Sequence, residues 1–265
     1  MSQTNTPILE LRDVSKSFGG NKALTRVNIQ ANAGEVICLL GDNGAGKSTL
    51  IKTLSGVHQP TTGTVLLDGK EVRFSDARHA MQNGIATVHQ EVGSIPLMTV
   101  GRNFFLGAEL TKGWGIFRRF DTARANALAL EQIRRLGITR VKNGDQLVGT
   151  LSGGERQALA IGRALYFGAR VLILDEPTSA LGVKESEIVL RLVRQAKADG
   201  LSVILITHNA THALAVGDRF VILIHGSVAS EFRRGEKSRE EVLNLMAGGE
   251  ALESLEARLD ANAAA

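Results

Sequence analysis

Short apolar runs alternate with helical patterns along most of the chain. Residues 35–40, 170–176, 201–208 and 219–226 are each dominated by consecutive apolar side chains, as expected for strands that are buried on both faces. Between these runs, apolar residues recur at helical spacing. Apolar strands that alternate with helices predict an α/β fold with a parallel sheet covered by helices.

A second kind of β pattern precedes the long helical region. Residues 61–72, TTGTVLLDGKEV, contain two short strand patterns joined by Asp68-Gly69, a dipeptide typical of hairpin turns. Residues 8–14 alternate between apolar and polar side chains and predict another strand.

From about residue 91 to residue 168 the pattern is mostly helical. Residues 121–137 are the clearest helix, with Asp121 placed to cap its start and Gly137 to end it. We therefore expect a helical subdomain inserted into the α/β core. A helical tail is expected over residues 248–265, with a frayed end.

The composition is that of an ordinary soluble globular protein. The 265 residues are 43% hydrophobic and 22% charged, and the net charge of +4 is too small to indicate nucleic acid. The single cysteine, Cys38, excludes an internal disulfide, and its apolar surroundings predict a small buried side chain. No segment approaches the length of about 18 apolar residues that spans a bilayer, and the N-terminus lacks a signal-peptide pattern. We therefore expect a cytoplasmic protein that meets a membrane through a partner.

Residues 41–48, GDNGAGKS, match the G-x-x-x-x-G-K-[ST] pattern of a phosphate-binding loop between a predicted strand and a predicted helix. In such a loop the backbone N–H groups surround a phosphate, so side chains must be absent at Gly44 and Gly46. Lys47 supplies a positive charge to the β- and γ-oxygens, and Ser48 offers a hydroxyl to Mg²⁺. The pattern predicts ATP and Mg²⁺ as ligands.

Polar residues follow three apolar strand patterns. Asp175 and Glu176 end one of them, at the strand edge where ligands bind in parallel sheets. We expect Asp175 to hold Mg²⁺ and Glu176 to orient and activate the attacking water. Gln90 is placed to touch both the metal and the water, and His208 to reach the γ-phosphate. The remaining histidines are expected in loops or on the surface: His58, His79, His89, His212 and His225.

Residues 151–155, LSGGE, begin a long amphipathic stretch. Ser152 and Glu155 form a capping-box pattern, but a cap does not require the two glycines between them, which are poor helix formers. Gly153 and Gly154 make sense if something bulky approaches the backbone, because exposed N–H groups at a helix N-terminus form an anion site. No lysine accompanies them, so the stretch is half of a site.

These motifs occur in the order and approximate spacing of ABC-transporter ATPase domains, which the chain resembles over residues 8–247. The LSGGE pentapeptide between the two Walker motifs is the most specific part of the resemblance. It implies a single P-loop NTPase domain with a RecA-like core, a small antiparallel β subdomain and a helical subdomain of about residues 91–168.

The resemblance also implies roles for individual residues. Lys47, Glu176 and His208 would be catalytic, and Ser48, Gln90 and Asp175 would hold the metal. Phe18 would stack on adenine, where a tyrosine is more usual; a plain core phenylalanine is the alternative. The remaining nucleotide contacts would come from Gly41, Asp42, Asn43, Gly44, Ala45, Gly46 and Thr49, with Gln90, Lys47 and Ser48.

In this family two subunits pair head to tail, so that each ATP lies between them. The contacts expected from the second copy are Ser152, Gly153 and Gly154. Hydrolysis would open the dimer and drive transmembrane permease subunits. Residues 94–98 are the expected docking surface, whereas Phe104 and Phe105 are expected in the core.

Residues 89–110 and 175–186 look like those of simple-sugar importers of the ribose, xylose or fructose type. This implies an ATPase at the cytoplasmic face of the membrane, a homodimer, permease subunits and, indirectly, a sugar-binding protein, without nucleic acid.

Other interpretations stay open: an amino-acid importer, an exporter, a soluble non-transport ABC ATPase, or an ATP sensor without hydrolysis. The sensor reading is weakened by Glu176, a residue able to act as a base. Gly182 stands where many relatives have aspartate, which leaves the coupling between the two sites open.

Overall fold

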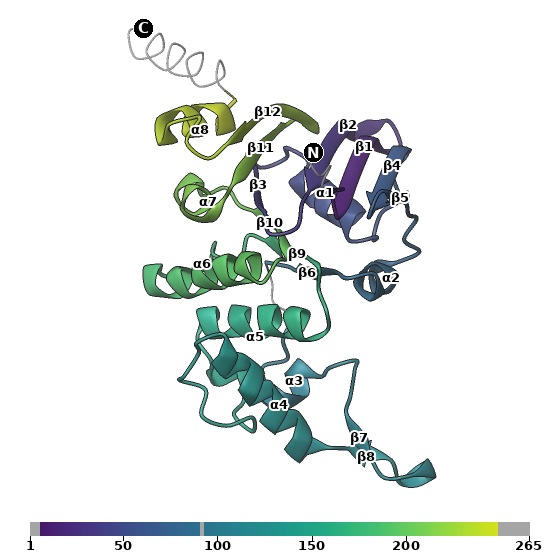
Figure 1. The fold of residues 1–265 in the computed structure, drawn as a ribbon, viewed down its shortest axis with the longest axis vertical. Helices are drawn as coiled ribbons and strands as arrows, with labels where there is room; N and C mark the ends of the chain where they lie inside the picture. Colours follow the sequence, from purple (N-terminus) through teal and green to yellow (C-terminus); the bar gives the residue numbers. More distant parts are fainter. Residues whose placement is uncertain (1–5, 91–92, 249–265) are drawn as a thin grey trace, which may run out of the picture.

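A six-stranded sheet forms the centre of the computed structural model, which describes residues 6–90 and 93–248 (Figure 1). Five strands are mutually parallel, and the sixth, at one edge, is antiparallel to its neighbour. The spatial order is β12 (Ser227–Arg233), β11 (Arg219–Ile224), β3 (Val36–Leu40), β10 (Ser202–Ile206), β9 (Val171–Asp175) and β6 (Ile85–Val88). The predicted α/β fold is confirmed, and the four apolar runs of the sequence are four of the parallel strands.

The two faces of this sheet belong to two hydrophobic cores. In β3, Val36, Cys38 and Leu40 enter one core, and Ile37 and Leu39 enter the other. The first core is completed by helices α5 (Gly153–Tyr166), α6 (Val183–Ala198), α7 (Ala210–Val216) and α8 (Arg239–Met246). The second is completed by α1 (Lys47–Leu54), α2 (Ala77–Gln82) and an antiparallel sheet. Burial on both faces explains the continuous apolar strand sequences.

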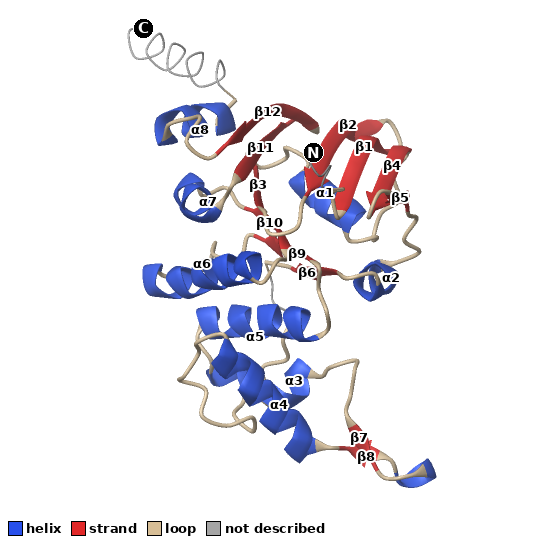
Figure 2. Cartoon of the chain, viewed as in Figure 1, coloured by secondary structure: helices blue, strands red, loops and turns tan. Residues whose placement is uncertain are grey.

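The antiparallel sheet lies beside α1, to the upper right in Figure 2. Its order is β2 (Asn21–Ala31), β1 (Leu9–Phe18), β4 (Thr62–Leu67) and β5 (Lys70–Glu71). Asp68 and Gly69 join the last two strands with φ angles of 50° and 74°, the left-handed conformation that this tight hairpin turn requires. The predicted hairpin is confirmed.

Residues 93–168 contain three α-helices: α3 (Val100–Phe104), α4 (Thr122–Arg135) and α5. Asp121 caps α4 by accepting the N–H of Arg124, and Gly137 follows the helix with φ 78°, as predicted. Phe104 and Phe105 are buried in the core, also as predicted. The helical pattern did not anticipate the hairpin of β7 (Thr111–Lys112) and β8 (Arg119–Phe120), which is joined through the short 3₁₀ helix η1 (Gly115–Phe117). Strands of two residues have no period to detect.

Cys38 is fully enclosed, as predicted. Its thiol lies 3.6 Å from the carbonyl oxygen of Ala213, and burial raises its pKa. Within the described residues, no helix is long and apolar enough to cross a membrane. The tail predicted for residues 248–265 lies, beyond residue 248, outside the described residues.

Candidate functional site

The phosphate-binding pattern forms the turn between β3 and α1. Gly46 precedes the helix with φ 102°, and no side chain caps the first helical turn. A Cβ at Gly46 would lie 2.8 Å from the carbonyl oxygen of Ala23, and one at Gly41 would lie 2.3 Å from that of Leu223. At Gly44 the space is open, and its φ of 81° alone favours glycine. The glycines therefore serve both packing and loop conformation, and they leave N–H groups uncovered.

Lys47 is held across this loop. Its ammonium donates hydrogen bonds to the carbonyl oxygens of Gly41 (2.7 Å) and Asp42 (2.9 Å), and the residue is buried. Ser48 and Thr49 follow it in the first turn of α1. The loop thus places one buried positive charge next to an uncapped helix N-terminus, an arrangement that favours anions.

Asp175 is the last residue of β9, and Glu176 follows in a left-handed conformation with φ 48°. Such strain in a non-glycine residue persists only where its surroundings fix it. The backbone N–H of Glu176 donates to the carbonyl of Ile206 (2.9 Å), and its Oε1 accepts a hydrogen bond from Nδ1 of His208 (2.9 Å). Its buried Oε2 has no hydrogen-bond partner among the described residues. His208 therefore holds the carboxylate in one orientation, and one of its oxygens makes no hydrogen bond to the described residues.

The surroundings of Asp175 differ from those of Glu176. Burial raises the pKa of the Asp175 carboxyl, the nearby His89 acts in the opposite direction, and Glu176 adds to the rise. His89 Nδ1 lies 3.8 Å from Asp175 Oδ2. His89 thus approaches a carboxylate of the site. The sequence predicts only a loop or surface position for it and no place in the site. The pairing of β6 with β9 brings the two residues together, and local sequence gives no signal of it.

One cavity of about 460 Å³ joins the loop, the strand ends and two turns. Among the predicted site residues it is lined by Asn43, Gly44, Ala45, Gly46, Lys47, Ser48, Thr49, Gln90, Asp175 and Glu176. Gln90 also donates its amide to the hydroxyl of Ser179 (3.2 Å). Gly41, Asp42, Phe18 and His208 are not on this wall, although the first two bond to Lys47 and His208 bonds to Glu176.

Three polar lining residues were missed from the sequence: Asn21, Lys22 and His225. Gly226 explains the position of His225, because its N–H donates to the carbonyl of Ala45 and so ties the β11–β12 turn to the phosphate-binding loop. Asn21 and Lys22 open β2, next to the turn after Phe18. The sequence can indicate that His225 and Gly226 form a turn, but it cannot indicate that this turn packs against the phosphate-binding loop.

Phe18 ends β1 and is 46% exposed, which excludes the core alternative. Its ring meets the ring of His58 edge to face at 5.1 Å, and the ammonium of Lys16 lies 5.1 Å from the ring centre. An accessible aromatic face is compatible with base stacking.

The LSGGE stretch begins α5 with the predicted capping box. Ser152 donates its N–H to Glu155 Oε2 (2.8 Å), and the Ser152 hydroxyl accepts the N–H of Glu155 (3.3 Å). The two glycines have a structural reason within the chain. A Cβ at Gly153 would lie 2.4 Å from Leu181, and one at Gly154 would lie 3.1 Å from Cβ of Glu185. The bulky neighbours are therefore Leu181, just before α6, and Glu185 in the first turn of α6. None of the three predicted trans residues lines the cavity.

A profile of the family described as ABC transporter matches residues 24–179, more than half of the chain. The chain belongs to the ABC transporter family. It is 41% identical over 239 residues to the xylose/arabinose import ATP-binding protein of Sulfolobus acidocaldarius, covering 90% of this chain and 93% of the relative. It is 43% identical over 220 residues to the fructose import ATP-binding protein of Rhizobium meliloti, covering 82% and 84%. The ribose import ATP-binding protein of Bacillus subtilis is 37% identical, and the chain spans 49% of that relative.

Solved ABC cassettes share the fold. A nucleotide-free ATP-binding cassette superposes with a TM-score of 0.76 at 26% identity, covering 89% of this chain and 94% of the cassette. A cassette solved as a dimer in a post-hydrolysis state with ADP and phosphate gives a TM-score of 0.71 at 27% identity, covering 86% and 100%. The resemblance to ABC-transporter ATPase domains, and the P-loop fold that it implies, are confirmed.

Proposed function

We propose that this chain is the ATP-hydrolysing subunit of an ABC importer for a simple sugar. One observation carries the hydrolytic part: a single cavity joins Lys47, Ser48, Asp175 and Glu176 in a chain of the ABC transporter family. The uncapped start of α1 and the buried ammonium of Lys47 suit a triphosphate. The adjacent carboxylates suit a metal-bound phosphate and its attacking water.

Glu176 is the general base in this proposal. The Ile206 carbonyl holds its backbone N–H, His208 holds its Oε1, and its Oε2 has no hydrogen-bond partner among the described residues. As that water attacks the γ-phosphorus, its proton passes to Glu176 and the bond to the β–γ bridging oxygen breaks. Lys47 offsets the negative charge that spreads over the γ-phosphoryl oxygens.

Mg²⁺ fits the donor set on the same wall. Ser48, Gln90 and Asp175 offer hydroxyl, amide and carboxylate oxygens, the ligand type that Mg²⁺ prefers. Burial raises the pKa of Asp175, so this carboxylate gains from a neighbouring cation. When bound, Mg²⁺ would neutralise charge on the β- and γ-phosphates.

We assign the missing half of each site to a second copy. The capping box uses the N–H groups of Ser152 and Glu155, and no acceptor within residues 6–90 and 93–248 reaches those of Gly153 or Gly154. These two amides are free to bind the γ-phosphate held by the other copy. The dimeric solved cassette supports such pairing.

The sugar assignment rests on the relatives, whose names specify xylose, arabinose, fructose and ribose import. We further propose that residues 8–247 form one cassette, with a helical subdomain at about residues 91–168. The chain would lie at the cytoplasmic face of the membrane, bound to permease subunits that receive sugar from a binding protein.

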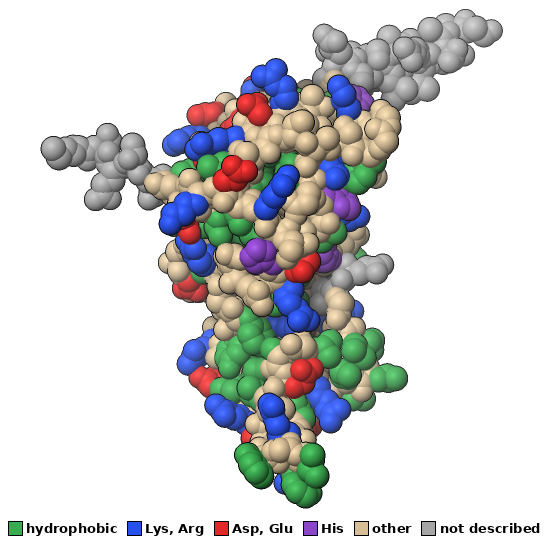
Figure 3. All heavy atoms as spheres, turned by 90° about the vertical axis from the view of Figure 1, so that its right-hand side faces the viewer, with side chains coloured by type: hydrophobic (Ala, Val, Ile, Leu, Met, Phe, Trp, Pro, Cys, Tyr) green, Lys and Arg blue, Asp and Glu red, His purple; other side chains and the backbone are tan. Residues whose placement is uncertain are grey.

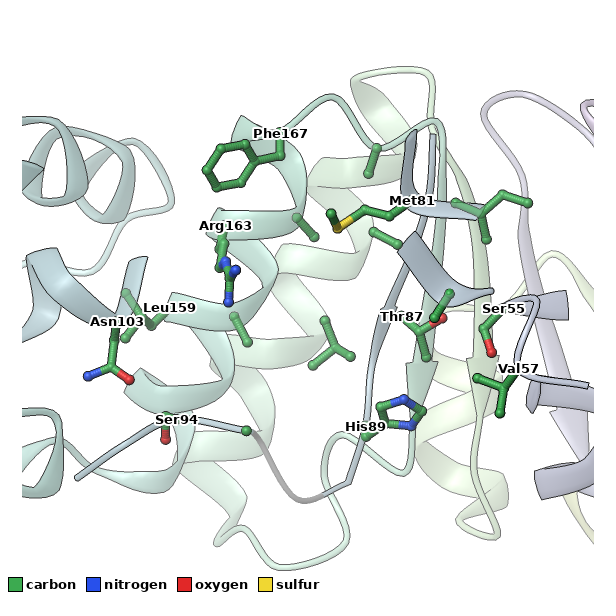
Figure 4. A pocket seen from close by; sticks show the side chains of 18 residues that line it. Ser55, Val57, Met81, Thr87, His89, Ser94, Asn103, Leu159, Arg163 and Phe167 are labelled. Atoms are coloured by element: carbon green, nitrogen blue, oxygen red, sulfur yellow. The ribbon is translucent and has the colours of Figure 1, made fainter. Parts of the chain in front are cut away.

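An apolar groove supports a permease docking site. A cavity of about 380 Å³ is lined from one side by Leu159 and Arg163 of α5 and by Phe167, which follows that helix, and from the other by Met81 of α2 and by β6 (Figure 4). Ser94, the first residue of the predicted docking segment, lies on its wall. Leu97 of the same segment is 86% exposed. The side chain of Asn103 holds this loop in place through bonds to the backbone of Ile95.

Glu176→Gln tests the hydrolytic assignment. The variant should bind ATP normally but hydrolyse it about 10²–10⁴-fold more slowly, because an amide cannot accept the proton. ATP binding and phosphate release measure the two effects. Glu187→Gln, the same change on the exposed side of α6, is the matched control and should keep the parent rate. Hydrolysis by Glu176→Gln at the parent rate would show that another residue is the base.

The same variants test the cargo class in cells. In a strain lacking this chain, the parent and Glu187→Gln should restore uptake of labelled ribose, xylose or fructose, and Glu176→Gln should not. Restored uptake of an amino acid but no sugar would replace the sugar assignment by an amino-acid importer and leave the ATPase assignment intact.

A further inference from the structure

The tip of the β7–β8 hairpin exposes three large hydrophobic side chains. Trp114, Ile116 and Phe117 are 88%, 95% and 78% exposed. Figure 3 shows hydrophobic side chains gathered at the lower end of the molecule, where Figure 1 places this hairpin. Isolated exposed apolar residues are normal on protein surfaces. Three within four positions, at the end of a projecting hairpin, require an explanation.

The tip is an ordered turn. Gly113 and Gly115 adopt φ angles of 94° and 56°, and the N–H of Phe117 donates to the carbonyl of Trp114 (3.1 Å). Below the tip, the guanidinium of Arg118 donates to the hydroxyl of Thr111 (2.9 Å). The backbone therefore holds the apolar side chains outward, away from both hydrophobic cores.

The charged residues within the hairpin itself are all basic. Residues 110–120 contain Lys112, Arg118 and Arg119 and no acidic residue. Lys112 pairs with Asp121 at 3.3 Å, whereas Arg118 and Arg119 are exposed directly after Phe117. The hairpin thus combines an apolar tip with two arginines at its base. This combination is complementary to a partner with an apolar interior and a negatively charged surface.

We propose that this hairpin inserts Trp114, Ile116 and Phe117 into the interface of a lipid bilayer, with Arg118 and Arg119 on anionic headgroups. Tryptophan and phenylalanine favour the headgroup boundary, and arginines near an anionic surface add electrostatic attraction. A convex tip of three side chains presents far less area than a stable protein interface needs, but a fluid bilayer can close around it. This contact goes beyond the proposed ATPase, because it involves lipid directly and not through the permease.

Trp114 is the only tryptophan of the chain, so its fluorescence reports on the tip alone. When the full chain is mixed with vesicles of phosphatidylcholine and phosphatidylglycerol, we expect the emission to shift to shorter wavelength. Lipids brominated on the acyl chains should quench it. Pure phosphatidylcholine vesicles should bind more weakly, and added salt should weaken binding to the anionic vesicles.

Two variants that keep Trp114 separate the contributions. Ile116→Ser with Phe117→Ser should weaken vesicle binding at least about tenfold, because less apolar area is buried. Arg118→Gln with Arg119→Gln should weaken it by a similar factor and remove the salt dependence. The matched control is Arg134→Gln with Arg135→Gln, an exposed pair on α4, which should bind as the parent does. Thermal unfolding identifies a variant that is misfolded.

Three results would overturn the proposal. The emission of Trp114 could stay that of a water-exposed indole with anionic vesicles and resist bromolipid quenching. It could shift with protein concentration alone, which would indicate a second copy as the partner. It could shift only with purified permease in detergent, which would indicate a protein partner. Each result is independent of ATP hydrolysis, so the proposed function would stand.

Discussion

Arg219 connects four parts of the chain around one guanidinium. It donates to both carboxylate oxygens of Glu35, at 2.8 and 3.1 Å, to Glu231 at 2.5 Å, and to the backbone carbonyl of Gln30. Burial raises the pKa of Glu35, but the hydrogen bonds and charge of Arg219, together with two hydrogen bonds from Asn32, more than offset this, so the pKa lies below its ordinary value of 4.5. The ion pair therefore favours the folded state when Glu35 is ionised.

We predict that Glu35→Gln flattens the acid dependence of stability. In the parent, this contribution is complete above the unfolded-state pKa, near 4.5, and is lost as the pH falls through the lower folded-state pKa. The variant should lose about 1 kcal/mol at neutral pH and then change less below that value. Urea unfolding over a pH series measures the difference.

Glu187→Gln is the control for this series, because the Glu187–Arg191 pair is exposed and contributes little. An unchanged acid dependence in Glu35→Gln would contradict the assigned role of the pair.

Local sequence patterns are enough to identify Lys47 and the acids Asp175 and Glu176, because each belongs to a motif with a physical requirement. It does not identify the left-handed conformation of Glu176 or the approach of His89 to Asp175. Both depend on which strands become neighbours in the sheet, and this information is not local.

At the scale of elements, the first turns of α5 and α6 lie against each other because Gly153 and Gly154 have no side chains. The sequence correctly indicates that something bulky approaches these glycines. It cannot indicate that α6 of the same chain is a neighbour, because that packing is tertiary. For the same reason it predicts α4 with both of its ends but not the β7–β8 hairpin.

We predict that Gly154→Val destabilises the chain without any nucleotide. The added Cβ would lie 3.1–3.2 Å from Glu185, including backbone atoms of α6, and the two methyl groups would add further overlap. A cost of about 1–3 kcal/mol is expected in denaturant unfolding.

Gly20→Ala, where no atom lies within 4 Å of the added Cβ and φ is not left-handed, should change stability little. Gly154→Val could instead unfold like the parent and no longer form the ATP-dependent dimer. That result would show that the glycine is needed for nucleotide binding and not for packing.

At the scale of the whole molecule, the proposed assembly contains two sites, each made from both copies. We predict that mixing a Lys47→Ala chain with a Ser152→Arg chain partly restores ATP-dependent pairing, which each variant lacks alone. In the mixed dimer both lesions fall in one site and leave the other intact. Light scattering across mixing ratios measures the recovery.

No recovery at any ratio would contradict head-to-tail sharing. A mixture of Lys47→Ala with the parent chain is the control for recovery that comes from the unmodified subunit alone.

The enclosure of Cys38 makes the chain almost inert toward thiol-directed labels. Its sulfur is buried and its raised pKa disfavours the reactive thiolate. A cysteine introduced at an exposed position such as Leu97 would therefore be the single reactive handle on the molecule. Dyes or spin probes can then be attached at chosen points, and the opening and closing of the proposed dimer followed in time, with the native cysteine left in place.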